Sequence, residues 1–376
     1  MRRLIGILHR GGGVAFRSRT LIPILFVLAW GLAGCGGRPP EGMLVPVTED
    51  VEGTSRVAIL AATTRQKSTK DPGEMFTGDR AEEVSYAAVT VSIPPDNARK
   101  IGEVQWAGSP PGDPRRDFVT VSASYLDKPA FVRALSTAAA KPTAHEKVLV
   151  FVHGFNNRFD DAVYRFAQIA HDSKSPAVPV LFTWPSRGEL RLRAYTYDRE
   201  SANYSRDALE DLLDLLSRNP NVAEINVVAH SMGNWLTLEA LRTRAIRTSR
   251  GTDKVKNVLL VAPDVDVDVF RTELRRMGPV RPRLAVFVSQ DDQALNISES
   301  LWGGVPRLGA VNPAEEPYHS EFAQANIEVF DLTSLKSAGD DAHDRAFTDV
   351  TSVMDLIKQR FRDGQQLTER EARASD

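Results

Sequence analysis

Six short, strongly apolar runs between residues 147 and 333 constrain the fold of this chain more than any other feature. They are KVLVFVHG (147–154), VPVLFTW (178–184), EINVVAHS (224–231), KNVLLVAP (256–263), RLAVFVSQ (283–290) and NIEVFDLT (326–333). Runs of this kind are typical of strands buried on both faces of a parallel sheet. Amphipathic helical stretches lie between several of them, for example at 158–172 and 201–219. This alternation predicts a mostly parallel central sheet with helices on both faces.

Three β-branched runs precede the alternating region. They are separated by turns rich in Pro, Gly and Asp, and they cover residues 56–64, 85–94 and 118–126. Their composition predicts edge or hairpin strands at the start of the same sheet. Residues 348–361 predict a closing helix, and the polar residues 364–376 predict a disordered tail. We therefore place a single α/β domain at residues 55–363.

The N-terminus combines a basic region with an apolar segment, 21–30, that is too short to span a bilayer comfortably. The segment ends in Leu-Ala-Gly-Cys35, which resembles a bacterial lipoprotein signal whose cysteine accepts the lipid. Cys35 is the only cysteine of the chain. We therefore expect a signal peptide over 1–35, lipidation at Cys35, a flexible tether over 36–54 and attachment to a bacterial envelope membrane. A signal anchor with an incidental cysteine is the alternative.

Ala229-His230-Ser231-Met232-Gly233 lies directly between an apolar run and a helix-forming stretch. A nucleophilic serine on a sharp strand-to-helix turn requires this context, with small neighbours on both sides. Gly233 meets the requirement on the far side, whereas Ala229 replaces the commoner glycine on the near side. The N-terminus of the following helix would favour developing negative charge. We expect Ser231 to be the nucleophile.

The sequence His153-Gly154-Phe155-Asn156 follows the first buried run. A loop at this position supplies one backbone N–H to an oxyanion hole, and the residue after the nucleophile supplies the other. We assign these donors to Phe155 and Met232. For His153 we favour a structural role over that of catalytic base, because the base comes last in chain order. His230 is likewise interpreted as a packing and hydrogen-bonding residue.

The acid and the base of a serine triad should follow the nucleophile in that order. Two acids compete: Asp264 follows the run 256–263, and Asp292 follows the run 283–290. The later position is the usual one, so we choose Asp292 and interpret Asp264 as a turn or cap residue. For the base we choose His343, in the loop after the last run, over His319, which precedes that run.

Several of these segments together resemble a family of bacterial α/β-hydrolases of unknown function, described as esterase- or lipase-like. They are VLVFVHGFNNRFDDAVYRFAQIAHD, PVLFTWPSRG, AYTYDRESANYSRDAL, INVVAHSMGN, VLLVAPDVD, SQDDQAL and the His343 loop. The resemblance covers roughly residues 55–360. It implies an α/β-hydrolase fold and a Ser231, Asp292 and His343 triad, and it says little about the substrate.

The expected function is hydrolysis of a small or lipid-like carboxylic ester by a membrane-tethered serine hydrolase. Such a triad needs no metal or organic cofactor. The net charge of −2 gives no case for nucleic-acid binding. An acyltransferase or amidase with the same triad is one alternative, and a non-catalytic binding or scaffold lipoprotein is another. Residues 187–205 and 299–320 are the expected cap elements over the site, and the oligomeric state is left open.

Overall fold

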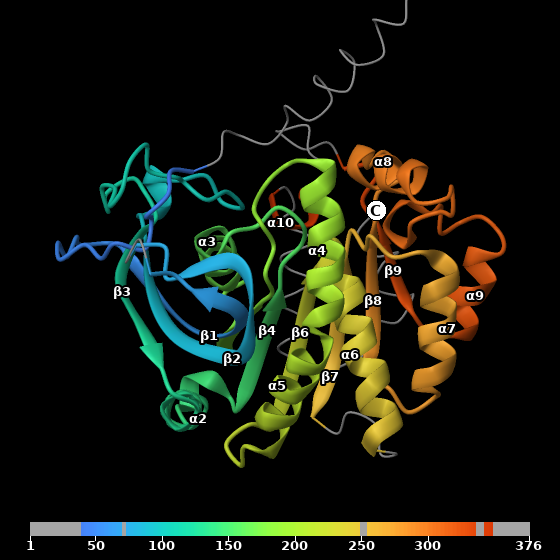
Figure 1. Ribbon diagram of the computed structural model, residues 1–376, viewed down its shortest axis with the longest axis horizontal. Helices are drawn as coiled ribbons and strands as arrows, with labels where there is room; N and C mark the ends of the chain where they lie inside the picture. Colours follow the sequence, from blue (N-terminus) through green and yellow to red (C-terminus); the bar gives the residue numbers. More distant parts are fainter. Residues whose placement is uncertain (1–38, 70–72, 249–253, 336–341, 349–376) are drawn as a thin grey trace, which may run out of the picture. The chain divides into compact units, whose positions relative to one another are not determined.

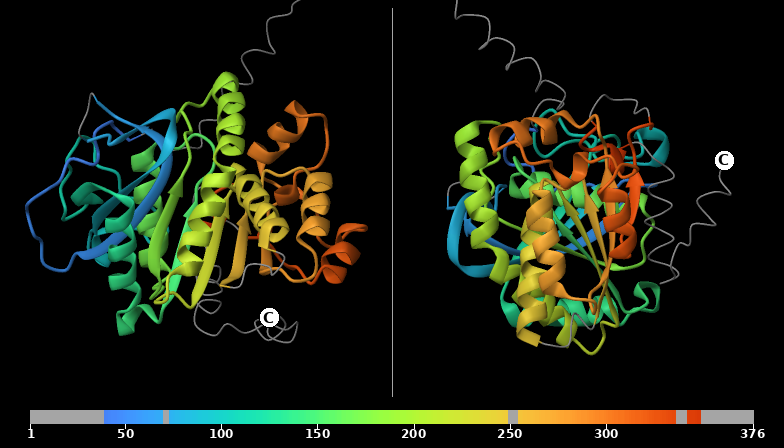
Figure 2. Two further views of the ribbon diagram at one scale, coloured as in Figure 1. Left: turned by 60° about the horizontal axis from the view of Figure 1, so that its bottom comes forward. Right: turned by 90° about the vertical axis from the view of Figure 1, so that its right-hand side faces the viewer.

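The computed structural model describes residues 39–69, 73–248, 254–335 and 342–348, and these contain a nine-stranded sheet with helices on both faces (Figures 1 and 2). The spatial strand order is β3-β2-β1-β5-β4-β6-β7-β8-β9. The strands are β1 (Ser55–Lys67), β2 (Phe76–Ile93), β3 (Val119–Leu126), β4 (Lys147–Val152), β5 (Val178–Thr183), β6 (Glu224–His230), β7 (Val255–Val261), β8 (Arg283–Val288) and β9 (Glu328–Asp331).

The sheet has an antiparallel edge and a long parallel part. β1 pairs with β2, and β2 with β3, in antiparallel register, whereas every pair from β1–β5 to β8–β9 is parallel. The six apolar runs form the strands β4 to β9, and the three β-branched runs form the edge. The predicted mostly parallel sheet is confirmed. Because the carboxyl ends of parallel strands meet at one edge, the loops after β4, β6, β7 and β8 lie together there.

Helices cover both faces of the sheet. They are α2 (Lys128–Ala139), α3 (Phe159–Asp172), α4 (Leu192–Tyr204), α5 (Arg206–Arg218), α6 (Met232–Thr248), α7 (Val267–Met277), α8 (Gln293–Leu301), α9 (Tyr318–Gln324) and α10 (Arg345–Thr348). One core layer packs α2, α5, α6 and α7 against the sheet, and the other packs α3 and α10. In α5 the buried leucines fall at spacings of three and four residues, at Leu209, Leu212, Leu213 and Leu216, which places them on one helix face.

Residues 39–54 differ in part from the flexible tether that their composition predicted. Met43 and Leu44 are buried at 0% and 1% exposure in the same core layer as α3. The carbonyl oxygen of Met43 accepts a hydrogen bond of 2.8 Å from the hydroxyl of Tyr164, and the Leu44 N–H donates to Gly73. The tether prediction is therefore wrong around Met43 and Leu44, because removing these two apolar side chains from water is favourable in free energy.

Other predictions fall on residues outside the described ranges. The signal peptide over 1–35, the polar tail over 364–376 and the closing helix beyond Thr348 belong to this group. Of the described helices, none is both long enough and apolar enough to cross a membrane.

Candidate active site

Ser231 lies between β6 and α6 in a backbone conformation that few non-glycine residues adopt. β6 ends at His230 and α6 begins at Met232, so one residue joins strand to helix. The φ angle of Ser231 is +52°, in the sparsely populated left-handed region. Its N–H donates to the carbonyl of Val261 (3.0 Å), and its carbonyl accepts from the N–H (3.1 Å) and the Nδ2 (2.9 Å) of Asn234. These bonds to β7 and α6 hold the turn at the carboxyl edge of the sheet.

Two glycines allow the loops around Ser231 to approach closely. A Cβ on Gly233 would lie 2.7 Å from the carbonyl oxygen of Val152 and would overlap that of His153. A Cβ on Gly154 would lie 2.8 Å from the Cβ of Ser231. The β4 loop and the serine turn can therefore pack together only because both side chains are absent.

Asp292 and His343 are brought together although 51 positions separate them in the sequence. The Nδ1 of His343 lies 2.7 Å from Oδ2 of Asp292. The other carboxylate oxygen of Asp292 accepts the N–H of Leu295 (3.1 Å), so the fully buried aspartate also caps α8. Burial alone would raise the pKa of Asp292, but His343, the Leu295 N–H and His230 together outweigh burial, so the pKa is lowered. The pair can hold an imidazole in a fixed orientation beside an ionised carboxylate.

Asp264, the competing acid, makes different contacts. Its carboxylate accepts hydrogen bonds from the hydroxyls of Tyr195 (2.6 Å) and Ser298 (2.7 Å), and its backbone N–H donates to the carbonyl of Ser231 (3.3 Å). It therefore joins α4 and α8 to the turn that carries Ser231. The competing base, His319, has 68% of its side chain exposed and lies 3.7 Å from Glu316.

His230 lies beside His343, with 4.8 Å between the ring centres. Its Nε2 is 3.3 Å from the carbonyl oxygen of His343 and 3.5 Å from Oδ1 of Asp344. Burial, reinforced by the positive charge that His343 can carry, lowers the pKa of His230 to about 4. A neutral imidazole thus supports the loop that carries His343, and Arg165 holds the same loop through Asp344 at 3.1 Å.

His153 is fully engaged in the loop after β4. Its Nδ1 is 2.8 Å from the carbonyl oxygen of Gly154, and its Nε2 is 2.9 Å from the hydroxyl of Thr183. The ring stacks on Trp184 at 4.9 Å, and the indole N–H donates to the His153 carbonyl (2.9 Å). Burial lowers the pKa of His153 well below its usual value. These contacts fit a structural role.

Met232 directly follows Ser231, and Phe155 belongs to the loop that packs against the serine turn. Phe155 follows Gly154, whose Cα is close to the Ser231 Cβ, and Asn156 next to it has a positive φ of 61°. Met232 is the first residue of α6, so its N–H has no partner within the helix. Phe155 and Met232 therefore remain the predicted oxyanion-hole donors.

Two buried charged residues that hold the loops after β4 and β5 were not predicted from the sequence. Arg65 of β1 is 1% exposed and donates to the carbonyls of Ser186 (2.8 Å) and Asn157 (2.7 Å). Burial lowers the pKa of Arg65 to about 10. Asp198 of α4, also fully buried, accepts from the N–H groups of Arg187 (2.9 Å) and Asn156 (3.4 Å). No short sequence pattern predicts the role of either residue, because the hydrogen-bond partners of their side chains lie more than ten residues away in the sequence.

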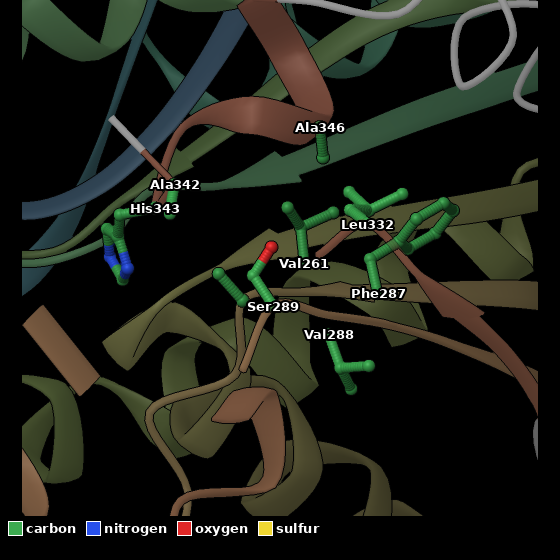
Figure 3. Close-up of a pocket in the computed structure, with 9 residues that line it drawn as sticks. Val261, Phe287, Val288, Ser289, Leu332, Ala342, His343 and Ala346 are labelled. Carbon is green, nitrogen blue, oxygen red and sulfur yellow. The ribbon is translucent and has the colours of Figure 1, made fainter. Parts of the chain in front are cut away.

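A cavity of about 10 Å³ lies beside His343, between the ends of β7 and β8 and the loop before α10 (Figure 3). A space of this size holds at most one water molecule. In Figure 3 the imidazole of His343 lies apart from the apolar side chains of Leu332 and Phe287. Among the described residues, no group of three or more His, Cys, Asp or Glu side chains could hold a metal ion.

The parallel sheet, the serine turn and the acid–histidine pair define the class of α/β-hydrolases. The chain belongs to the family described as "Alpha/beta hydrolase of unknown function (DUF900)", whose model matches residues 131–360. The predicted fold and family are confirmed. No curated protein matched the chain.

Several solved structures are similar to this chain at low identity. An esterase from Pyrobaculum calidifontis is 12% identical with a TM-score of 0.34, covering 84% of this chain and 86% of its own. A protein described as a predicted CIB-like hydrolase from Thermoplasma acidophilum is 13% identical with a TM-score of 0.33, covering 59% and 89%. One of two fungal esterases from Rhizomucor miehei is 12% identical with a TM-score of 0.30, covering 76% and 81%.

Proposed function

We propose that this protein is a serine hydrolase that cleaves a carboxylic ester through Ser231, His343 and Asp292. The observation that carries the proposal is the 2.7 Å contact between His343 Nδ1 and the buried carboxylate of Asp292, at the same sheet edge as Ser231. In a serine triad, a buried acid orients the imidazole that activates the hydroxyl, and Ser231 lies on a strained turn at this sheet edge.

The proposed mechanism uses this chain's own residues only. Neutral His343 accepts the proton of the Ser231 hydroxyl as the serine oxygen attacks the ester carbonyl carbon, while Asp292 stabilises the imidazolium. The N–H groups of Phe155 and Met232 hydrogen-bond the oxyanion of the tetrahedral intermediate. The alcohol leaves with the proton from His343, and water then repeats the sequence on the acyl-enzyme.

The nucleophile is tested by labelling the purified full-length protein with a fluorophosphonate probe, alongside Ser231→Ala and His343→Ala variants. We expect labelling and ester hydrolysis to be absent in Ser231→Ala and at least about 10³-fold slower in His343→Ala. Persistent labelling of Ser231→Ala would show that another residue reacts. A wild-type protein that is labelled but transfers its acyl group to an added alcohol faster than to water would be an acyltransferase.

We further propose that a lipid on Cys35 attaches the protein to a bacterial envelope membrane. The proposal is supported by the Leu-Ala-Gly-Cys35 sequence and by the position of the chain's only cysteine. Eight residue steps separate Cys35 from the buried Met43, so the linking chain reaches at most about 28 Å. The test is incorporation of labelled palmitate in cells. We expect it in the wild type and not in Cys35→Ala, and equal uptake by both would contradict the anchor.

A further inference from the structure

Arg199 of α4 lies between two indole rings. Its guanidinium carbon is 4.4 Å from the ring centre of Trp302 and 5.3 Å from that of Trp235. The side chain is only partly buried. Within the part of the chain that the structure describes, no carboxylate oxygen forms an ion pair with Arg199 at 4.0 Å or less. A guanidinium held between aromatic faces keeps its hydrogen-bond donors available at the ring edges.

The two indoles connect Arg199 to the proposed reaction centre. Trp302 stacks on Tyr195 at 5.5 Å, and Tyr195 contacts Phe155 edge-on at 5.1 Å. Phe155 carries one of the proposed oxyanion N–H groups. α4 runs beside α6, and its first turns extend past the ends of the strands towards α8 (Figure 1). A continuous series of aromatic contacts therefore connects Phe155 in the loop after β4 with Arg199.

Trp235, the second indole in contact with Arg199, lies in the first turn of α6, close to the proposed nucleophile in the sequence. It is the fourth residue after Ser231, which corresponds to a rise of about 6 Å along α6. Side chains on a helix lean towards its N-terminus, so the indole of Trp235 leans towards the end of α6 that carries Ser231. Arg199 is thus linked through Trp235 to the first turn of α6, which directly follows Ser231.

Asp264, an acid in contact with the same aromatic cluster, does not balance the charge of Arg199. Asp264 is already matched by Arg307 at 3.5 Å and by the hydroxyls of Tyr195 and Ser298. The indole N–H of Trp302 is buried without a hydrogen-bond acceptor among the described residues. A cation and an unsatisfied N–H in the same aromatic cluster favour a bound anion.

We propose that Arg199 binds an anionic group of the substrate, so that the enzyme prefers esters bearing a carboxylate or phosphate. This inference rests on the proposed ester hydrolysis at Ser231. Guanidinium groups bind such oxyanions through paired N–H donors, and the adjacent indoles exclude water from the contact. Arg199 is therefore a specificity-determining residue and takes no part in the bond-breaking steps.

The test compares matched esters with the purified full-length protein. On the acyl side, the 4-nitrophenyl monoester of adipic acid is compared with that of adipamic acid. On the alcohol side, 4-acetoxybenzoate is compared with 4-acetoxybenzamide. In each pair a carboxylate replaces a neutral amide of similar size. We expect the wild type to show a higher kcat/KM for the anionic member of at least one pair, which also tells whether the anion belongs to the acid or the alcohol.

Arg199→Gln should lower the anionic-to-neutral ratio of kcat/KM by about 10- to 100-fold, mainly through KM, and Arg199→Lys should retain part of the preference. Arg193→Gln, an exposed arginine of the same helix, is the control and should leave the ratio unchanged. A wild type without preference in either pair, or a ratio unaffected by Arg199→Gln, would overturn the proposal and leave Arg199 as a packing residue.

A binding experiment distinguishes failure of this proposal from failure of the proposed ester hydrolysis. The same four esters are titrated against Ser231→Ala protein, with tryptophan fluorescence as the readout. We expect the anionic member to bind tighter, and Arg199→Gln in that background to remove the difference. If the fluorophosphonate experiment fails while the binding preference persists, the nucleophile is wrong and the anion site stands. Equal binding of charged and neutral members would refute the anion site whatever the fate of Ser231.

Discussion

Replacing Asp292 by Asn tests the proposed acid most directly, because it removes the charge and keeps the shape. Asparagine is as good a helix N-cap as aspartate, so the hydrogen bond from the Leu295 N–H should persist and α8 should still begin at the same residue. The buried contact with His343 Nδ1 changes, because the amide group can present an N–H where the carboxylate presented an acceptor.

The magnitude follows from the geometry of that contact. The carboxylate oxygen is 2.7 Å from Nδ1, and we take the two charge centres as about 4 Å apart. At an effective dielectric of about 20, this separation stabilises an imidazolium by about 4 kcal/mol, or about 10³-fold in rate. Loss of the correct imidazole tautomer adds to this effect, so we expect kcat to fall by about 10³- to 10⁴-fold.

The assay is steady-state hydrolysis of a 4-nitrophenyl ester, with far-UV circular dichroism to show that the variant is folded. Asp264→Asn is the matched comparison, since both acids follow a parallel strand of the same sheet. Because the carboxylate of Asp264 bonds two hydroxyls, its loss should change kcat by less than about tenfold. An active Asp292→Asn together with an inactive Asp264→Asn would refute the assignment of the acid.

Three further perturbations follow from the site. Gly233→Ala should place a methyl group against the His153 carbonyl, which cannot move freely. We expect the free energy of unfolding to fall by about 1–3 kcal/mol and fluorophosphonate labelling to be weak. Normal stability with full labelling would contradict this expectation. The pKa of His230 is lowered from 6.5 to about 4, so the free energy of unfolding should fall by about 3 kcal/mol between pH 6.5 and pH 4 as the unfolded chain takes up the proton. Urea unfolding of His230→Asn should show a weaker dependence of stability on pH over this range. The same pH dependence in wild type and variant would contradict the lowered pKa. Tyr195→Phe removes the hydroxyl that donates a 2.6 Å hydrogen bond to the carboxylate of Asp264, and should lower the free energy of unfolding in urea by about 1–3 kcal/mol. An unchanged unfolding midpoint and an unchanged denaturant slope would mean that this hydrogen bond contributes nothing to stability.

Much of the fold could be predicted from the sequence, because strand and helix signals are local. The run before Ser231 and the stretch after it are adjacent in the chain, so the strand-to-helix turn is visible without a structure. The order of the buried runs and their lengths were sufficient to predict the parallel sheet. By contrast, the segment around Met43 and Leu44 has the composition of a linker, and its burial depends on a partner surface formed by α3 and distant strands.

The candidate site divides in the same way. Chain order and the neighbouring runs by themselves determined the candidates Ser231, Asp292, Asp264 and His343, since each follows a predicted strand. Only the tertiary structure decided which acid lies beside the histidine, because two carboxylates after neighbouring strands have nearly the same local sequence context. It also decided that Arg199 stands between two indoles from α6 and the end of α8. Contacts of this kind join residues tens of positions apart, and no short-range pattern in the sequence records them.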